Sequence, residues 1–350
     1  MTKAVRDEAL RLRRTAQAHE EAGDFEAAEP IWRRVLDLRP DDMDAPERLA
    51  LGQIIHGELA ASPANAPRVL VLGNCQSYSI SACLRALNPD LMVAALSWTE
   101  LRTTAQVERL LAIAEGVDAV LVQPVDVSRV QSLSADALAG RGVRCVQFPR
   151  IHFTGFHPDA VRMRGRALEG LIGPWHSALI MAGYRMRLPE DRTEELFNAY
   201  VYGALGYFDE YDKACSFQDA TFSALGWDPL PNSRDGTRPF VHVPYHPRIE
   251  AMMELARSAG ARLGIEVDRR ASPPPDPLLR FGAWPVYPEI GKRLGLAGDV
   301  RFVPPGHSGG GMDLREAISR SYAAYARSPE RLIPPPRVKH LIEILKAEGI

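Results

Sequence analysis

The sequence has few cysteines, no long apolar run and no excess of charge of either sign. Four of its 350 residues are cysteine, and their spacing fits neither a zinc ribbon nor a disulfide framework. We therefore expect free thiols and a reducing, cytoplasmic environment. No segment approaches the ~18 consecutive apolar residues of a membrane span, and the first residues lack the apolar core of a signal peptide. The net charge of -2 gives no general attraction to nucleic acid or to anionic membranes.

The composition is that of a globular protein with more than one folded part. Apolar residues make up 46% and charged residues 25% of the chain, as in ordinary globular proteins. A chain of 350 residues exceeds one ordinary core, so about two domains are expected. We place the first at residues 1–62 and the second at residues 68–350, with the proline-bearing segment "ASPANAP" between them.

The first domain has the pattern of a helical hairpin. Residues 5–38 carry apolar side chains at helical spacing, with a break at Gly23. The stretch "EEAGDFEAAEPIWRRVLDLRPDD" resembles a tetratricopeptide repeat, in which Ala28 lets two helices approach, Trp32 fills the groove and Pro40 ends the second helix. One repeat cannot build a solenoid. A hairpin that packs on the main domain and a hairpin that binds a protein partner are therefore equally favoured.

The second domain begins with alternating strands and helices. The strands are near-continuous apolar runs, which is typical of buried parallel strands, and we expect them at Arg68–Leu72, Leu91–Leu96, Ala119–Gln123 and Val143–Phe148. The intervening helices are expected at Ser79–Leu87, Leu101–Ala114 and Ala135–Ala139. Right-handed crossovers would give a small, doubly wound parallel sheet of the α/β class.

The carboxyl half is predicted to be mainly helical and rich in loops. Helical patterns occur at Asp159–Leu171, His176–Met186, Arg192–Tyr207, Arg248–Leu263, Leu314–Ala326 and Val338–Glu348. The segments between them are rich in proline and aromatic residues, and such loops can build a pocket.

The turn "LGNCQS" is the first candidate site. Ligands of open α/β sheets bind at the carboxyl ends of the strands, and Cys75 lies just past such an end and just before a helix. A helix N-terminus favours thiolate over thiol. Asn74 and Gln76 can offer amide donors to an oxyanion or a carbonyl, and Ser77 begins the helix. A lone cysteine is more often buried packing, but the strand–turn–helix context favours a site residue.

The loop "FPRIHFTGFHPD" follows the fourth strand and is the second candidate. His157 is a candidate general base or acid, oriented by Asp159 or by a backbone carbonyl. Arg150 precedes it, and His152 is interpreted as aromatic packing. Two histidines in one loop lack the further ligands of a metal site, so no metal is expected.

Three weaker signals complete the candidates. In "VHVPYHPRIE", His246 precedes a helix and Arg248 stands in its first turn, where a cation suits an anionic partner such as phosphate. Gln123 ends the third strand and is a candidate substrate contact. The glycine run in "PPGHSGGGMDLREAI" favours a mobile loop over phosphate binding, and it matches no P-loop.

These motifs occur together in one known family. Residues 68 to about 310 resemble the WcbI-type polysaccharide biosynthesis family, on four motifs in order: the Gly73–Gln76 turn, "GFHP" within the second loop, "YHPRI" and "WPVYPEIGKRLGL". The first turn is also similar to the start of SGNH-type esterases, with the serine replaced. The chain departs from the family where a tyrosine, not an asparagine, precedes the His-Pro pair, and its amino-terminal repeat lies outside the resemblance.

The resemblance implies an acetyltransferase that uses acetyl-coenzyme A and a sugar or glycan acceptor. Cys75 and His157 would then be catalytic. The coenzyme would contact Asn74, Gln76, Ser77, Gln123, Arg150, His246 and Arg248. Two alternatives stay open, a thiol-type esterase related to the SGNH enzymes and a glycan- or protein-binding module without activity.

Overall fold

The structure, a computed structural model, describes residues 3–22, 24–39, 66–101, 103–125, 128–163, 170–230, 238–306 and 310–349. The chain divides into two compact units, of which unit 1 comprises residues 1–150 and 252–275 and unit 2 comprises residues 151–251 and 276–350. The linker expected at residues 61–67 lies mostly outside the described ranges, so the division into 1–62 and 68–350 stays a prediction. Within the described ranges, no helix combines the length and apolar character needed to cross a membrane.

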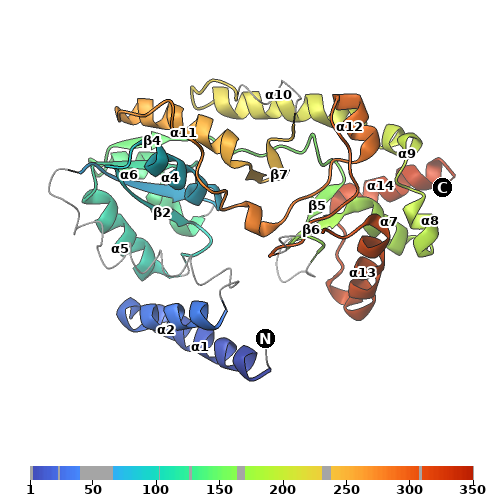
Figure 1. The fold of residues 1–350 in the computed structure, drawn as a ribbon, viewed down its shortest axis with the longest axis horizontal. Helices are drawn as coiled ribbons and strands as arrows, with labels where there is room; N and C mark the ends of the chain where they lie inside the picture. The colour runs from blue at the N-terminus through green and yellow to red at the C-terminus, as the bar shows by residue number, and fades with distance from the viewer. Residues whose placement is uncertain are drawn as a thin grey trace. The chain divides into compact units, whose positions relative to one another are not determined.

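The amino-terminal helical hairpin is present. It consists of α1 (Lys3–Glu21) and α2 (Phe25–Leu38), which lie side by side (Figure 1). The hairpin has its own buried cluster, formed by Ala16, Ala28, Trp32 and Val35. Gly23 and Pro40, the turn glycine and the terminal proline of the expected repeat, lie outside the described residues.

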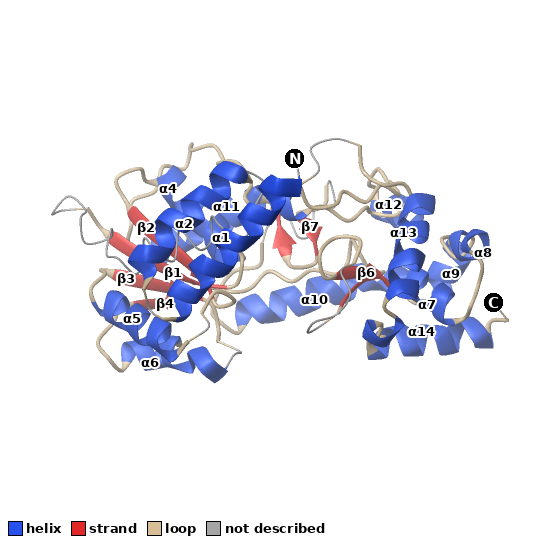
Figure 2. Ribbon diagram, turned by 90° about the horizontal axis from the view of Figure 1, so that it is seen from below, coloured by secondary structure: helices blue, strands red, loops and turns tan. Residues whose placement is uncertain are grey.

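A four-stranded parallel sheet forms the centre of unit 1, with the strand order β2-β1-β3-β4 (Figures 1 and 2). Its strands are β1 (Arg68–Gly73), β2 (Met92–Ser97), β3 (Ala119–Val122) and β4 (Cys145–Gln147). The connections contain α4 (Gln76–Leu87), α5 (Thr104–Glu115), η2 (Ser128–Leu133) and α6 (Ala135–Ala139). The predicted α/β class and each predicted strand and helix of this part are therefore confirmed, with small differences at their ends.

The apolar strands are buried on both faces of this sheet. Leu70 and Leu72 of β1 belong to one core cluster with Leu110 of α5 and Leu138 of α6. The chain leaves β1 for β2 on one side, while β3 pairs with the other edge of β1. This reversal is a topological switch point, where the crevice beyond the strand ends receives ligands in folds of this type. A ligand site is therefore expected at the residues that follow β1 and β3.

Unit 2 is mainly helical, as predicted. Its helices are α7 (Ala178–Arg185), α8 (Glu190–Glu194), α9 (Ala199–Ala204), η3 (Tyr207–Asp209), α10 (Glu210–Ser223), η5 (Leu279–Phe281), α12 (Pro288–Leu294), α13 (Leu314–Arg327), η6 (Pro329–Arg331) and α14 (Pro336–Ala347). Helix α11 (Ile249–Leu263) begins in unit 2 and continues in unit 1. Two antiparallel pairs complete the unit, β5 (Ala160–Arg162) with β6 (Trp175–Ser177) and β7 (Val241–Val243) with β8 (His246–Pro247).

Two of the helix predictions for this half are wrong in part. Where a helix was expected over Asp159–Leu171, the described residues contain strand β5, because Ala160–Arg162 pair with the strand that precedes α7. The helix expected over Arg192–Tyr207 is broken, because Asn198 adopts an extended conformation and its Oδ1 accepts a hydrogen bond from the first turn of α9.

Candidate functional site

The turn between β1 and α4 places Cys75 at a helix N-terminus. Gly73 ends the strand, and Cys75 is the N-cap residue of the twelve-residue helix α4, with φ -55° and ψ -18°. The residue is partly buried. Partial positive charge at the start of a helix stabilises an anion there, which suits a reacting thiolate or a bound oxyanion.

The side chain of Gln123 holds this turn. Its Oε1 accepts a hydrogen bond from the backbone N–H of Asn74 at 2.9 Å, and its Nε2 donates to Oε1 of Gln76 at 3.1 Å. A Cβ atom on Gly73 would lie 2.7 Å from Gln123 Oε1, so this close approach requires glycine. Gln123 follows β3, which is the neighbour of β1 in the sheet. The polar turn is therefore fixed by the strand beside it.

The remaining polar groups of the turn are largely used within unit 1. Asn74 Oδ1 accepts from the backbone N–H of Gln76 at 2.9 Å, and Asn74 O accepts from that of Ser77 at 3.0 Å. The buried Ser77 hydroxyl donates to Leu96 O at 3.1 Å, which ties α4 to β2. Gln76 and Gln123 are also fully buried. Among the expected amide donors, the Nδ2 group of Asn74 is the one for which the described residues supply no acceptor.

The structure also describes Arg150 and the other three cysteines. Arg150 is partly buried and stands three residues after β4. Of the other cysteines, Cys83 is buried within α4, and Cys215 of unit 2 is partly buried. Burial raises the pKa of Cys145 to about 11, so this thiol stays protonated near neutral pH.

His157 is a buried, neutral histidine of unit 2. Its Nδ1 lies 3.3 Å from Pro285 O, and its buried Nε2 has no hydrogen-bond partner among the described residues. Burial lowers the pKa of His157 to about 4, and the nearby Arg248 and His242 lower it further, against the opposing effect of the carbonyl contacts. A backbone carbonyl therefore contacts the ring, which is one of the two arrangements expected from the sequence.

Asp159 does not orient His157. Its Oδ1 accepts from the backbone N–H of Leu179 at 2.9 Å and from Tyr207 Oη at 3.1 Å, and its Oδ2 accepts from Tyr287 Oη at 2.7 Å. Burial raises the pKa of Asp159, while these hydrogen bonds oppose the rise. The carboxyl group joins the first turn of α7 to two buried tyrosines, which is a structural role.

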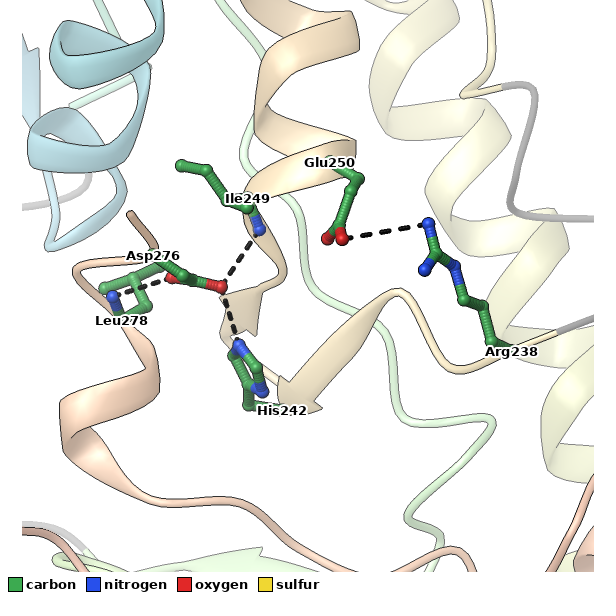
Figure 3. A network of polar contacts seen from close by, with 6 residues as sticks. All are labelled: Arg238, His242, Ile249, Glu250, Asp276 and Leu278. Carbon is green, nitrogen blue, oxygen red and sulfur yellow. Dashed lines mark hydrogen bonds and ion pairs between the residues drawn. The ribbon is translucent and has the colours of Figure 1, made fainter. Parts of the chain in front are cut away.

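A second histidine of the same unit, His242, contacts an aspartate that orients its ring (Figure 3). His242 Nε2 lies 2.7 Å from Oδ2 of Asp276, and both side chains are largely buried. Asp276 also accepts from the backbone N–H groups of Ile249, at the start of α11, and of Leu278. Burial pulls the pKa of Asp276 upward, but the hydrogen bonds outweigh it and leave that pKa below its ordinary value. The buried Nδ1 of His242 has no hydrogen-bond partner among the described residues.

The sequence alone did not indicate this pair. His242 is a single polar residue between two buried valines of β7, and Asp276 stands in the proline-rich "ASPPPDP". A histidine between two buried valines could have suggested a functional residue. No sequence motif, however, connects it to an aspartate 34 residues away.

His246 and Arg248 lie beside this pair along the chain. Burial, together with the nearby His242 and Arg162, lowers the pKa of His246 to about 4, against the opposing effect of Asp276. Burial also lowers the pKa of Arg248, and its Nε has no partner among the described residues. Arg248 directly precedes α11 and is not in its first turn, which is a small correction to the sequence analysis.

His152 packs against aromatic residues, as the sequence indicated. Its ring stacks on Tyr245 with a centroid separation of 4.0 Å. In the described part of the chain, no group of three or more His, Cys, Asp and Glu side chains is arranged to hold a metal ion.

The fold and the turn together define an α/β protein with a candidate site at the carboxyl edge of a parallel sheet. The sequence matches the family described as "Polysaccharide biosynthesis enzyme WcbI" over residues 68–268, more than half of the chain, and the protein belongs to this family. No curated protein matches the sequence.

A solved structure of WcbI, described as a novel polysaccharide biosynthesis enzyme, has a similar fold. The two chains share 15% identity and a TM-score of 0.55, over 81% of this chain and 96% of that one. That structure is described as the native protein without a disulfide bond between coenzyme A and a cysteine. At this identity the likeness shows the fold alone.

We predict that Gln123→Met loosens the β1 turn. The variant keeps a side chain of similar length but loses both hydrogen bonds to the turn. The free energy needed to open the turn locally therefore falls by about 2–4 kcal/mol. Hydrogen exchange of the β1 and β3 amides measures this change. Gln131→Met, at an exposed position, is the matched control and leaves exchange unchanged. Equal protection in the two variants would contradict the role assigned to Gln123.

We also predict that His157 makes stability depend on pH in the acid range. The ring titrates near its ordinary value of 6.5 when unfolded and at about 4 when folded, so the unfolded chain binds more protons between these values. Stability is therefore full above about pH 6.5 and falls as the pH drops toward 4. His157→Gln reduces this slope in denaturation midpoints measured from pH 7 to 4.5. A variant with the slope of the wild type would show that the buried ring is not the cause.

Proposed function

We propose that this protein transfers an acetyl group from acetyl-coenzyme A to a hydroxyl of a sugar or glycan. The carrying observation is the fixed turn that holds Cys75 at the N-terminus of α4, at the switch point of the sheet. Membership of the WcbI family supports a role in polysaccharide biosynthesis. The description of the similar solved structure mentions coenzyme A together with a cysteine, and we assign the corresponding place in this chain to Cys75.

Two routes use the same turn. In the covalent route, the Cys75 thiolate attacks the thioester carbonyl, the bond from carbonyl carbon to coenzyme A sulfur breaks, and coenzyme A leaves as its thiolate. The sugar hydroxyl then attacks the acetyl-cysteine, loses its proton to a base and releases Cys75. In the direct route, a base deprotonates the hydroxyl, which attacks acetyl-coenzyme A itself. In both routes the N-terminus of α4 and Asn74 Nδ2 stabilise the oxyanion.

For the base we propose a histidine. His157 is the first candidate, because its low pKa leaves the ring unprotonated at neutral pH and its Nε2 has no hydrogen-bond partner among the described residues. His242 is the second candidate, because Asp276 orients its ring and would stabilise the imidazolium that forms.

The other candidates divide into supports and coenzyme contacts. Gln76, Ser77 and Gln123 keep the turn in shape, because their polar groups are used within unit 1. We propose Arg150, His246 and Arg248 as contacts of the coenzyme, with the two arginines binding its phosphates. The amino-terminal hairpin is assigned to a protein partner, and the cytoplasm, where acetyl-coenzyme A is made, is the proposed location.

The test is thermal denaturation with coenzyme A and acetyl-coenzyme A. A ligand that binds the folded state at 100 times its Kd stabilises it by about 2.7 kcal/mol, so the melting temperature rises. Gln131→Met is expected to respond like the wild type. The same melting temperature with and without either ligand would contradict coenzyme binding and favour a module without activity. Rapid hydrolysis of a simple ester without coenzyme A would favour the esterase.

A further inference from the structure

Unit 2 carries a surface groove of about 740 Å³ whose lining contains none of the candidate site residues discussed above. It lies around the end of α7, the start of α8 and the carboxyl-terminal part of α13. Its lining includes Tyr184, Arg185, Arg187, Glu190, Tyr322 and Pro329. The volume falls within the range of about 300–1,000 Å³ that is usual for small-molecule sites.

Arg187 occupies this groove with an unfavourable backbone conformation. Its φ is 61°, in the left-handed region that residues other than glycine rarely adopt. The backbone N–H of Leu188 donates to Gly183 O at 2.9 Å and that of Arg187 donates to Tyr184 O at 3.1 Å. These two bonds form a Schellman motif at the end of α7, with Arg187 at the position that glycine usually takes.

Other helices of this chain end in the same way with glycine. At each of these ends a glycine has positive φ, and the backbone N–H of the following residue donates to a carbonyl five residues before it. The glycines are Gly142 after α6, Gly226 after α10, Gly264 after α11 and Gly295 after α12. Among the described residues, Arg187 is the non-glycine residue with positive φ. Backbone strain of this kind is found where a side chain has a function, which directs attention to the Arg187 guanidinium.

The guanidinium groups of Arg185 and Arg187 are available for a ligand. Both residues are exposed, and neither forms an ion pair or hydrogen bond of its side chain within the described parts of the chain. Neighbouring arginines are paired, Arg192 with Glu195 and Arg315 with Glu194. The planar guanidinium matches a carboxylate in a two-pronged contact.

The aromatic wall of the groove is already in place. Tyr322 Oη donates to Leu188 O at 3.0 Å and lies 2.6 Å from Thr193 Oγ1. The Tyr184 ring packs edge-on against Tyr322, with centroids 5.2 Å apart. Rings that are fixed before binding lower the entropy cost of association. Such rings offer an apolar surface for the C–H face of a sugar ring, and Glu190 can accept hydrogen bonds from its hydroxyls.

We propose that this groove binds an acidic saccharide, a glycan that carries carboxylate groups. Two unpaired arginines would bind the carboxylates, and the two tyrosines would pack against the sugar rings. The proposal goes beyond the proposed function, because it assigns a saccharide site that does not depend on the transfer reaction. Binding itself is independent of coenzyme A and can be measured without it.

The decisive variant is Arg187→Gly. Glycine suits the left-handed backbone, so the variant loses the guanidinium and the strain together, and the denaturation midpoint does not fall. Loss of ligand binding in this variant therefore cannot come from unfolding. Arg187→Lys keeps a positive charge, and Arg320→Ala removes an arginine that pairs with Glu316 on α13.

Calorimetric titration with trigalacturonate, maltotriose and triglutamate tests the proposal in the absence of coenzyme A. The wild type binds trigalacturonate saturably and at least tenfold more tightly than the neutral maltotriose or the peptide. Arg187→Gly weakens trigalacturonate binding at least tenfold, Arg187→Lys weakens it less, and Arg320→Ala leaves it unchanged. Absence of trigalacturonate binding by the wild type, or equal binding by Arg187→Gly, would overturn the groove as the site. Equal binding of triglutamate would replace the saccharide with an acidic peptide. A failure here leaves coenzyme binding at Cys75 untouched, and the reverse also holds.

Discussion

The paired hydrogen bonds of the Gln123 amide hold the candidate site in unit 1 together. They connect the end of β3 to the turn after β1, so the turn keeps its shape only while these two strands are neighbours. The contact requires glycine at position 73 and uses the backbone N–H of Asn74. As a result, Cys75 is presented at the start of α4 by a rigid sheet edge. A reacting group gains most from such positioning when its supports are themselves fixed.

Two buried aspartates join separate segments of unit 2 through hydrogen bonds. Asp159 binds two tyrosines and the start of α7, while Asp276 binds His242 and the start of α11. Burial of His157 lowers its pKa to about 4 without a carboxylate partner. One aspartate is therefore structural, and the other both caps a helix and orients a histidine ring. Asp159 therefore stabilises the fold, whereas Asp276 supports a candidate catalytic histidine.

The sequence was sufficient for the sheet and for the Cys75 turn, because both depend on local pattern. Apolar runs predict buried parallel strands, and a glycine between strand and helix predicts the turn. The helix expected over Asp159–Leu171 was wrong, because pairing of Ala160–Arg162 with a later strand overrides local preference. The hydrogen bonds from Gln123 to the turn could not be predicted, because they depend on which strands are neighbours in the sheet. The contact between His242 and Asp276 joins a strand to a loop 34 residues away, so a single sequence could not reveal it.

The most direct test of the central claim is reaction of the native protein with coenzyme A disulfide, followed by peptide mass mapping. A thiolate that faces the bound coenzyme attacks the disulfide, forms a mixed disulfide and releases one coenzyme A thiolate. We predict modification of Cys75 well before Cys145 and Cys215, which are also partly buried. Unmodified Cys75, or equal modification of all three cysteines, would contradict the account of the β1 turn as the coenzyme site.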